Sequence, residues 1–318
     1  MNKNRKLKEN KIKGQIEETI VEETEIVGDG NVTEVTEITE TTAEAVDITA
    51  AEAEAERNAL AESIDEGDYL LKVEHLKKYF PLATDFFGKP TSFVRAVDDV
   101  TFGVKAGQTV GIVGESGCGK TTMGRTVLRL HSVTGGKVIF DGHDIGSMSA
   151  SQLRKIRPQI QMIFQDPYSS LNPAWTIGRI LSEPLLLSGM KDKAEVKASV
   201  YDMLVRVGLD GSYYGRYPSQ LSGGQRQRVS IATALSARPK LVIADEPLSA
   251  LDVTIQAQIM ELLMELKKEL GLTYIFISHD IDVVYQLCDR IMVMKDGRVH
   301  GIMHNAPVIH RVHAQNRL

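Results

Sequence analysis

The sequence has few cysteines, few aromatic residues and no long apolar run. Its 318 residues include two cysteines, Cys118 and Cys288, which lie far apart and form no Cys-x-x-Cys pair. This spacing offers no disulfide or metal framework and fits a reducing cytosol. No stretch approaches the ~18 consecutive apolar residues that a transmembrane helix needs, and no apolar segment follows the basic start of the chain. Any role at a membrane would therefore require binding to a protein already embedded there.

Charge is distributed unevenly along the chain. Residues 1–66 contain 18 acidic and seven basic side chains and no aromatic residue, a net charge of −11, so the rest of this −5 chain carries +6. Such a segment buries too little apolar surface to offset its chain entropy. We expect residues 1–66 to form a disordered acidic tail, either simply solvated or serving in docking or regulation, with nascent helix around residues 51–63. The small net charge of the whole chain argues against a nucleic-acid partner.

From about Tyr69 the pattern is that of an α/β domain, which we expect to extend over residues 67–318. Short apolar runs of strand length recur at residues 70–75, 109–113, 138–140, 241–244 and 273–277. Between the last two, apolar residues at helical spacing predict an amphipathic helix that ends at Gly271. Strands that alternate with helices predict a mainly parallel sheet covered on both faces. Residues 166–237, punctuated by four prolines, are predicted to be an inserted helical subdomain.

A glycine-rich loop follows the second of these strands. Residues 114–121, Gly-Glu-Ser-Gly-Cys-Gly-Lys-Thr, match the pattern G-x-x-x-x-G-K-[ST] and precede a helix predicted over residues 121–130. Glycines let backbone N–H groups converge on a phosphate, and the helix dipole favours the anion. By itself the loop indicates a nucleoside triphosphate and leaves P-loop kinases and GTPases open. The predicted nucleotide-binding residues are Gly114, Glu115, Ser116, Gly117, Cys118, Gly119, Lys120, Thr121 and Thr122.

Two carboxylates end the apolar run at residues 241–244. Asp245 is suited to the coordination shell of Mg²⁺, and Glu246 is suited to polarise an attacking water. We expect Thr121 and Asp245 to hold Mg²⁺, and Lys120 to supply a positive charge to the β- and γ-phosphates of the nucleotide.

A third motif narrows the class. Residues 221–225, Leu-Ser-Gly-Gly-Gln, place two glycines and a serine at a helix start, which makes a second anion-binding end. The motif resembles the signature of the ATP-binding cassette (ABC) family. That resemblance implies a P-loop NTPase fold with a RecA-like parallel-sheet core, an antiparallel β part and an inserted helical subdomain. It also implies that Ser222, Gly223, Gly224 and Gln225 cap the γ-phosphate of ATP held by a partner cassette.

Other positions match family motifs in order. The resemblance implies that the nucleotide is ATP and that Gln165 joins Thr121 and Asp245 around Mg²⁺ and senses the water. It also implies that Asp252 belongs to the loop Ser-Ala-Leu-Asp and that His279 contacts the γ-phosphate. It implies that Tyr79 stacks on adenine, with Phe80 as a second candidate. The expected catalytic residues are then Glu246, His279, Gln165 and Lys120, and the expected activity is ATP hydrolysis.

Residues 165–173, Gln-Asp-Pro-Tyr-Ser-Ser-Leu-Asn-Pro, resemble more specifically the oligopeptide, dipeptide and nickel importer branch, in its F-type subunit. This implies an ATPase that energises peptide uptake at the cytoplasmic face of the plasma membrane. The implied partners are a second cassette subunit, identical or different, two membrane permease subunits and, indirectly, an extracellular solute-binding protein. Two alternatives stay open, a soluble cassette ATPase outside transport and a truncated, non-catalytic cassette subunit.

The end of the chain departs from that branch. Residues 300–318 match no expected segment, and we predict an irregular tail, truncated or frame-shifted relative to the family. Four histidines fall there, His300, His304, His310 and His313, but without nearby cysteines or paired acids they favour a frayed tail over a metal site.

Overall fold

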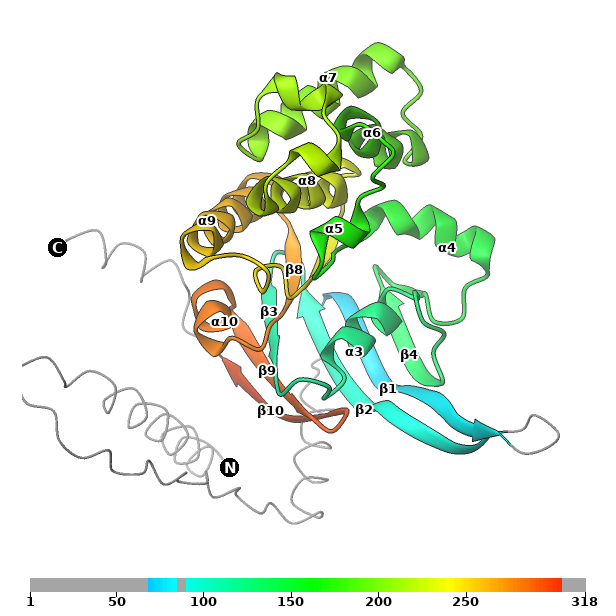
Figure 1. The fold of residues 1–318 in the computed structure, drawn as a ribbon. Coiled ribbons are helices and arrows are strands. Elements are labelled where there is room, and N and C mark those ends of the chain that lie inside the picture. Colours follow the sequence, from blue (N-terminus) through cyan, green and yellow to red (C-terminus); the bar gives the residue numbers. More distant parts are fainter. Residues whose placement is uncertain (1–67, 85–89, 305–318) are drawn as a thin grey trace, which may run out of the picture. The chain divides into compact units, whose positions relative to one another are not determined.

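The computed structural model describes residues 68–84 and 90–304, so the predicted acidic tail and residues 305–318 lie outside the described residues. The described part contains two sheets, a six-stranded one in the order β10-β9-β3-β8-β7-β6 and a four-stranded one in the order β2-β1-β4-β5 (Figure 1). The architecture is therefore the mixed α/β fold expected from the sequence.

The larger sheet is parallel except for its last strand, β10, which is antiparallel to β9. Every residue of β3, β7 and β8 is buried, because helices or the second sheet cover both faces. Its strands are β3 (Thr109–Val113), β6 (Ile160–Ile163), β7 (Leu241–Asp245), β8 (Thr273–Ile277), β9 (Arg290–Lys295) and β10 (Arg298–His304).

The smaller sheet is antiparallel throughout and alternates buried and partly exposed side chains, as Leu71 and Val73 alternate with Leu70 and Lys72. Its two long strands shift register near residue 75, where His75 and Asp99 adopt left-handed backbone angles. The strands are β1 (Tyr69–Thr84), β2 (Pro90–Lys105), β4 (Gly135–Phe140) and β5 (His143–Asp144).

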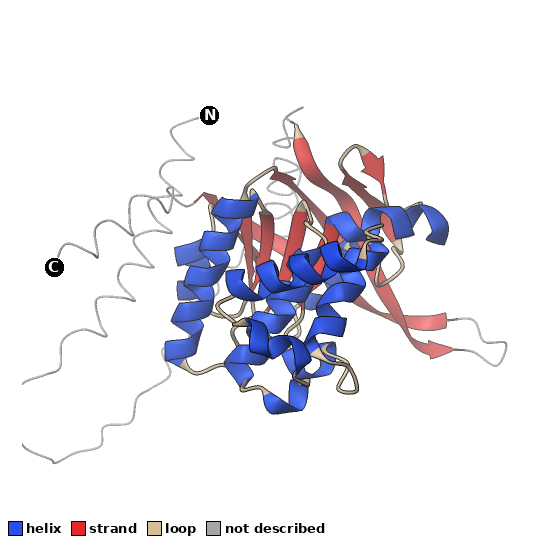
Figure 2. Ribbon diagram, turned by 90° about the horizontal axis from the view of Figure 1, so that it is seen from above, coloured by secondary structure: helices blue, strands red, loops and turns tan. Residues whose placement is uncertain are grey.

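Helices and sheets form two apolar cores on opposite faces of the larger sheet. Side chains such as Val242 and Ala244 on β7 pack with the helices α6 to α10, whereas Leu241 and Ile243 pack with α3 and the smaller sheet. Figure 2 shows most helices gathered on one side of the strands. The helices are α3 (Lys120–Val127), α4 (Ala150–Ile156), α5 (Pro167–Ser170), α6 (Ile177–Leu187), α7 (Lys193–Arg206), α8 (Gly223–Ser236), α9 (Val253–Leu270) and α10 (Ile281–Leu287).

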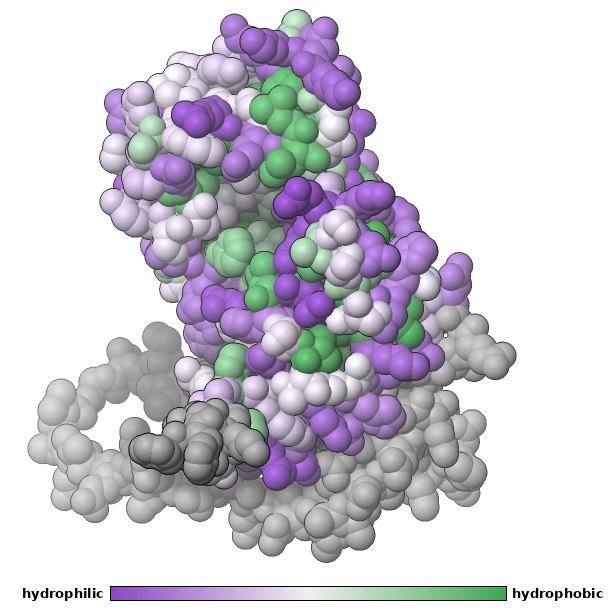
Figure 3. All heavy atoms as spheres, turned by 90° about the vertical axis from the view of Figure 1, so that its right-hand side faces the viewer, coloured by the Kyte–Doolittle hydropathy of each residue, from purple (hydrophilic) through white to green (hydrophobic). Residues whose placement is uncertain are grey.

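Between residues 166 and 237 the regular structure is entirely helical, from α5 to α8. The amphipathic helix predicted before β8 is α9, and Gly271 ends it with a left-handed φ of 64° as expected. No helix among the described residues is long and apolar enough to cross a membrane. On the face drawn in Figure 3, hydrophilic side chains predominate and apolar ones gather in separate patches.

Two sequence predictions are corrected. The helix predicted over residues 121–130 stops at Val127, because Arg129 turns into the left-handed region with a φ of 55°. The tail predicted to be irregular from His300 is wrong for residues 300–304, because residues 298–304 form β10 and pair with β9, while residues 305–318 lie outside the described residues. This strand gives a weak sequence signal because Val299 is its one fully buried residue.

Candidate functional site

The glycine-rich loop joins the carboxyl end of β3 to the start of α3. A Cβ at Gly114 would lie 2.1 Å from the carbonyl oxygen of Met294, and one at Gly119 would lie 2.0 Å from that of Ala96. Both glycines also have positive φ angles, 155° and 104°. The loop is therefore built from glycine because its backbone is pressed against two neighbouring strands.

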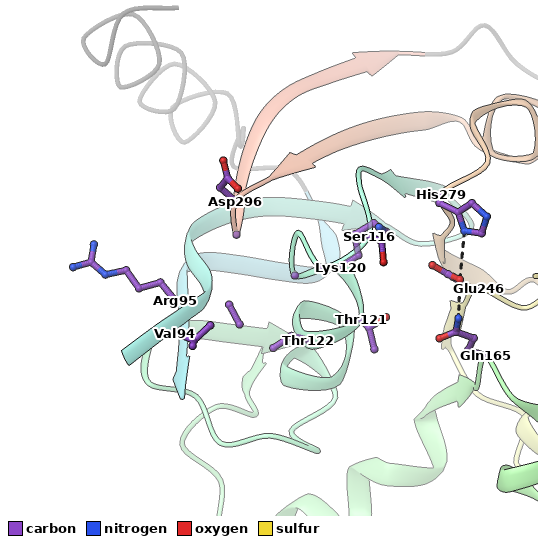
Figure 4. Close-up of a pocket in the computed structure, with 14 residues that line it drawn as sticks. Val94, Arg95, Ser116, Lys120, Thr121, Thr122, Gln165, Glu246, His279 and Asp296 are labelled. Atoms are coloured by element: carbon purple, nitrogen blue, oxygen red, sulfur yellow. Dashed lines mark hydrogen bonds and ion pairs between the residues drawn. The ribbon is translucent and has the colours of Figure 1, made fainter. Parts of the chain in front are cut away.

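Lys120 begins α3 and is 5% exposed. Its Nζ donates hydrogen bonds to the carbonyl oxygens of Gly114, at 2.7 Å, and Glu115, at 2.8 Å, which hold the charge within the loop. Around this charge opens a cavity of about 640 Å³ (Figure 4). It is lined by Val94, Arg95, Ala96, Ser116, Gly117, Gly119, Lys120, Thr121, Thr122, Gln165, Glu246, His279, Asp296 and Gly297.

Thr121 and Asp245 meet beside this cavity. The Thr121 hydroxyl donates to Oδ1 of Asp245 at 2.7 Å, while the buried Oδ2 has no hydrogen-bond partner and lies 3.8 Å from the Arg125 guanidinium. Burial raises the pKa of Asp245, the charge of Glu246 adds to the shift, and the Thr121 hydrogen bond and Arg125 oppose it. A buried carboxylate oxygen without a donor is the arrangement that a hard cation satisfies.

The oxygen-bearing side chains at this edge of the cavity fit Mg²⁺. Among the described residues, no three His, Cys, Asp or Glu side chains gather closely enough to hold a metal ion. Mg²⁺ takes few protein oxygens and completes its shell with water and substrate phosphates. Thr121, Gln165 and Asp245 would hold it.

Three polar side chains from three strand ends form a row across the cavity. Gln165, after β6, donates its Nε2 to Oε2 of Glu246 at 2.8 Å, and Nδ1 of His279, after β8, lies 3.4 Å from the same oxygen (Figure 4). Glu246 follows β7 with a φ of 46°, and its N–H donates to the Ile277 carbonyl oxygen. The backbone at Glu246 is strained, and its side chain lines the cavity.

The signature residues lie apart from this cavity. Ser222 caps α8 by accepting from the Gln225 N–H, and the Gln225 side chain accepts from the Ser222 N–H. Asp252 likewise caps α9 through the N–H of Ile255. These residues, with Gly223 and Gly224, are not among those that line the cavity. The chain thus presents the N-terminus of α3 to its own cavity and the N-terminus of α8 to a different part of its surface.

Tyr79 also stands outside the cavity lining but next to it. It pairs in register with Arg95, whose guanidinium lies 5.8 Å from the centre of its ring. Phe80, which pairs with the lining residue Val94, packs edge-on against His131. Adenine stacking on Tyr79 stays a prediction.

Five residues of the cavity were missed by the sequence analysis. Val94, Arg95 and Ala96 come from β2, and Asp296 and Gly297 form the turn between β9 and β10. No motif marks them, because they reach the loop through pairing between distant strands. Only the Asp-Gly pair, typical of a tight turn, is visible in the sequence.

Replacing Asp245 with Asn is expected to raise the free energy of unfolding by on the order of 1 kcal/mol at pH 7, because it removes a buried charge. Because the pKa of Asp245 is raised in the folded state, its carboxyl group disfavours folding only where it is ionised. Below the pKa of the unfolded state the group is protonated in both states. The stability gained by the Asn variant should therefore shrink in acid. Urea unfolding of the full chain measures it, with the exposed Asp141→Asn as control. A less stable Asp245→Asn protein would contradict the burial argument, whereas ATP hydrolysis should fall.

Comparisons with known proteins give a family model, curated relatives and solved structures similar to this chain. The family model described as "ABC transporter" matches residues 97–249. The oligopeptide transport ATP-binding protein AppF of Bacillus subtilis is 51% identical over 72% of this chain and 70% of its own length. The dipeptide transport ATP-binding protein DppF of Escherichia coli is 45% identical over 72% and 68%. The dimeric ATP-binding cassette MJ0796 bound to ADP and Pi superposes with a TM-score of 0.67 at 31% identity, over 74% of this chain and 99% of that one.

Proposed function

Because the chain belongs to the ABC transporter family and is one of its ATPases, we propose that it energises peptide uptake as an ATP-hydrolysing subunit of an importer. Two relatives named for oligopeptide and dipeptide transport support the peptide substrate, together with the importer-like stretch at residues 165–173. The solute is recognised by the membrane and solute-binding subunits, so this chain supplies the energy and they supply the selectivity.

The row Gln165–Glu246–His279 beside the phosphate loop carries this proposal. The loop N–H groups and Lys120 bind the phosphates of ATP, and Tyr79 takes the base. Glu246 accepts a proton from a water molecule while the oxygen of that water bonds to the γ-phosphorus of ATP. The bond between the γ-phosphorus and the bridging oxygen breaks, and that oxygen leaves with ADP. His279 steadies the transferring phosphoryl group. Mg²⁺, when bound, neutralises charge on the phosphate oxygens.

The active unit is a pair of cassettes. The Ser222–Gln225 helix start is an anion-binding end that does not line this chain's own cavity. In the pair it closes over ATP held by the second cassette, which is either an identical or a different subunit, and the partner's signature closes over this one. Each ATP is then enclosed by the cavity of one chain and the helix N-terminus of the other.

The proposed contact with a permease is formed by residues 166–180, a segment that begins directly after Gln165 and includes α5. Tyr168 is 58% exposed there, and the Arg226 guanidinium from α8 lies 5.0 Å from its ring centre. An exposed aromatic residue beside an arginine suits a protein interface. We place a cytoplasmic loop of one permease subunit against this surface, which puts the chain at the cytoplasmic face of the membrane.

Reconstitution tests the proposal. The full chain, its candidate second cassette and the two permeases are assembled in vesicles with the solute-binding protein, and ATP hydrolysis and uptake of a labelled peptide are measured. We expect hydrolysis to rise severalfold with peptide-loaded binding protein, and the uptake to require ATP. Hydrolysis at full rate by this chain without any membrane subunit, and no peptide uptake, would contradict it.

A further inference from the structure

A buried carboxylate joins three strands at the edge of the cavity. The Tyr79 hydroxyl of β1 donates to Oδ1 of Asp98 on β2 at 2.5 Å. Arg298 of β10 donates to the other oxygen, Oδ2, from Nε at 3.0 Å and from Nη2 at 2.6 Å. The Asp98 side chain is 8% exposed. Each carboxylate oxygen therefore has its own partner, and the tyrosine is connected to the arginine through Asp98.

The same carboxylate residue ties this network to the phosphate loop. The Asp98 N–H donates to the carbonyl oxygen of Gly297, and the Gly297 N–H donates to that of Cys118 in the loop, at 2.8 and 2.9 Å. Gly297 lines the cavity and sits in the turn next to Arg298. Both of these bonds join backbone groups, so a change of the Asp98 side chain alone leaves them in place and acts on Tyr79.

The charges favour this geometry. Burial alone would raise the pKa of Asp98, but the hydrogen bonds donated by Tyr79 and Arg298, with the positive charges of Arg298 and Arg95, hold it below its usual value. The carboxylate therefore stays ionised near neutral pH. Hydrogen bonds to an ionised acceptor are shorter and stronger than neutral ones. A phenolic O–H lies in the plane of its ring, so an acceptor fixed by Arg298 sets both the position of the ring end and its tilt.

We propose that Asp98, held by Arg298, is a positioning residue that fixes the Tyr79 ring and so sets the affinity of the cavity for the base of the nucleotide. The inference rests on the proposed role of Tyr79 as the surface on which adenine stacks. Asp98 is not among the residues that line the cavity around the phosphate loop. Its effect should therefore appear with ligands that carry a base and not with a bare polyphosphate.

The test is competition binding with the purified full chain. A fluorescent ATP analogue is displaced by Mg²⁺-ATP or by Mg²⁺-tripolyphosphate, which has the phosphates and lacks the base. Asp98→Asn is expected to weaken ATP binding about fivefold to tenfold and to leave tripolyphosphate binding within about twofold, since base stacking is the interaction affected. Tyr79→Phe, which keeps the ring and removes the hydroxyl, should weaken ATP binding severalfold, and the double variant should lose no more than Asp98→Asn alone.

Asp99→Asn is the matched control, because the neighbouring carboxylate contacts His75 and not Tyr79, and asparagine tolerates its left-handed backbone. It should bind both ligands like the unaltered chain. Equal losses for ATP and tripolyphosphate in Tyr79→Phe and Asp98→Asn would mean a general structural role and overturn the proposal. Unchanged ATP binding in both, with a loss in Tyr79→Ala, would overturn the positioning role alone. Unchanged ATP binding in Tyr79→Ala would overturn the role of Tyr79 as well.

Discussion

Replacing Glu246 with Gln is expected to lower steady-state ATP hydrolysis by the assembled transporter about 10³-fold, while ATP affinity changes less than about twofold. Gln has the same shape, and its amide oxygen can still accept the hydrogen bond that Gln165 donates to Glu246 at 2.8 Å. The geometry of the row is thus kept. What is lost is a carboxylate that accepts a proton from the attacking water. ATP should therefore bind and hold two cassettes together without being cleaved.

The measurements are phosphate release at saturating ATP and the mass of the ATP-bound assembly by size-exclusion chromatography with light scattering. Glu261→Gln, an exposed change of the same chemistry on α9, is the control and should behave like the unaltered chain. Near-normal turnover in Glu246→Gln would remove Glu246 from the catalytic step. Loss of ATP binding would instead mean that the carboxylate supports the fold of the site.

Contiguous segments explain why much of the site could be predicted from the sequence. The loop at residues 114–121 and the carboxylates after β7 each lie within one short stretch, and a buried parallel strand gives a continuous apolar run. The carboxyl ends of parallel strands meet at one edge of the sheet, so Gln165, Glu246 and His279, each shortly after such a strand, fall together. Short stretches of sequence therefore identify these side chains and also predict that they lie close together.

The remaining part of the cavity depends on contacts between distant strands. Ala96 and Gly297 lie against Gly119, although they are about 200 residues apart in the chain, and no short pattern encodes such an approach. Residues 300–304 of the edge strand β10 are predicted to be irregular for a related reason, since this strand draws its stability from hydrogen bonds to β9 more than from apolar side chains. The turn that β10 completes is also what brings Arg298 to Asp98.

Replacing Gly223 with Asp is expected to leave the chain folded and able to bind ATP, yet to lower hydrolysis by the assembled pair at least about 100-fold. A Cβ at Gly223 would meet only the Leu251 side chain, at 3.9 Å, and the residue has no positive φ. A carboxylate in the first turn of a helix interacts favourably with the helix dipole and stabilises the helix by about 0.3–1 kcal/mol. Because Gly223 does not line this chain's own cavity, ATP affinity should change less than about twofold.

The loss arises across the interface. In the proposed pair the α8 N-terminus faces the γ-phosphate held by the second cassette, so the added carboxylate repels the anion that the helix end would otherwise bind. Gly223→Asn, similar in size and neutral, separates charge from volume and should lose less. Phosphate release, urea unfolding and ATP binding are measured for each variant. Equal hydrolysis in Gly223→Asp and the unaltered chain would mean that this helix end does not approach a phosphate. A loss of ATP binding by the isolated chain would mean that it serves the chain's own nucleotide.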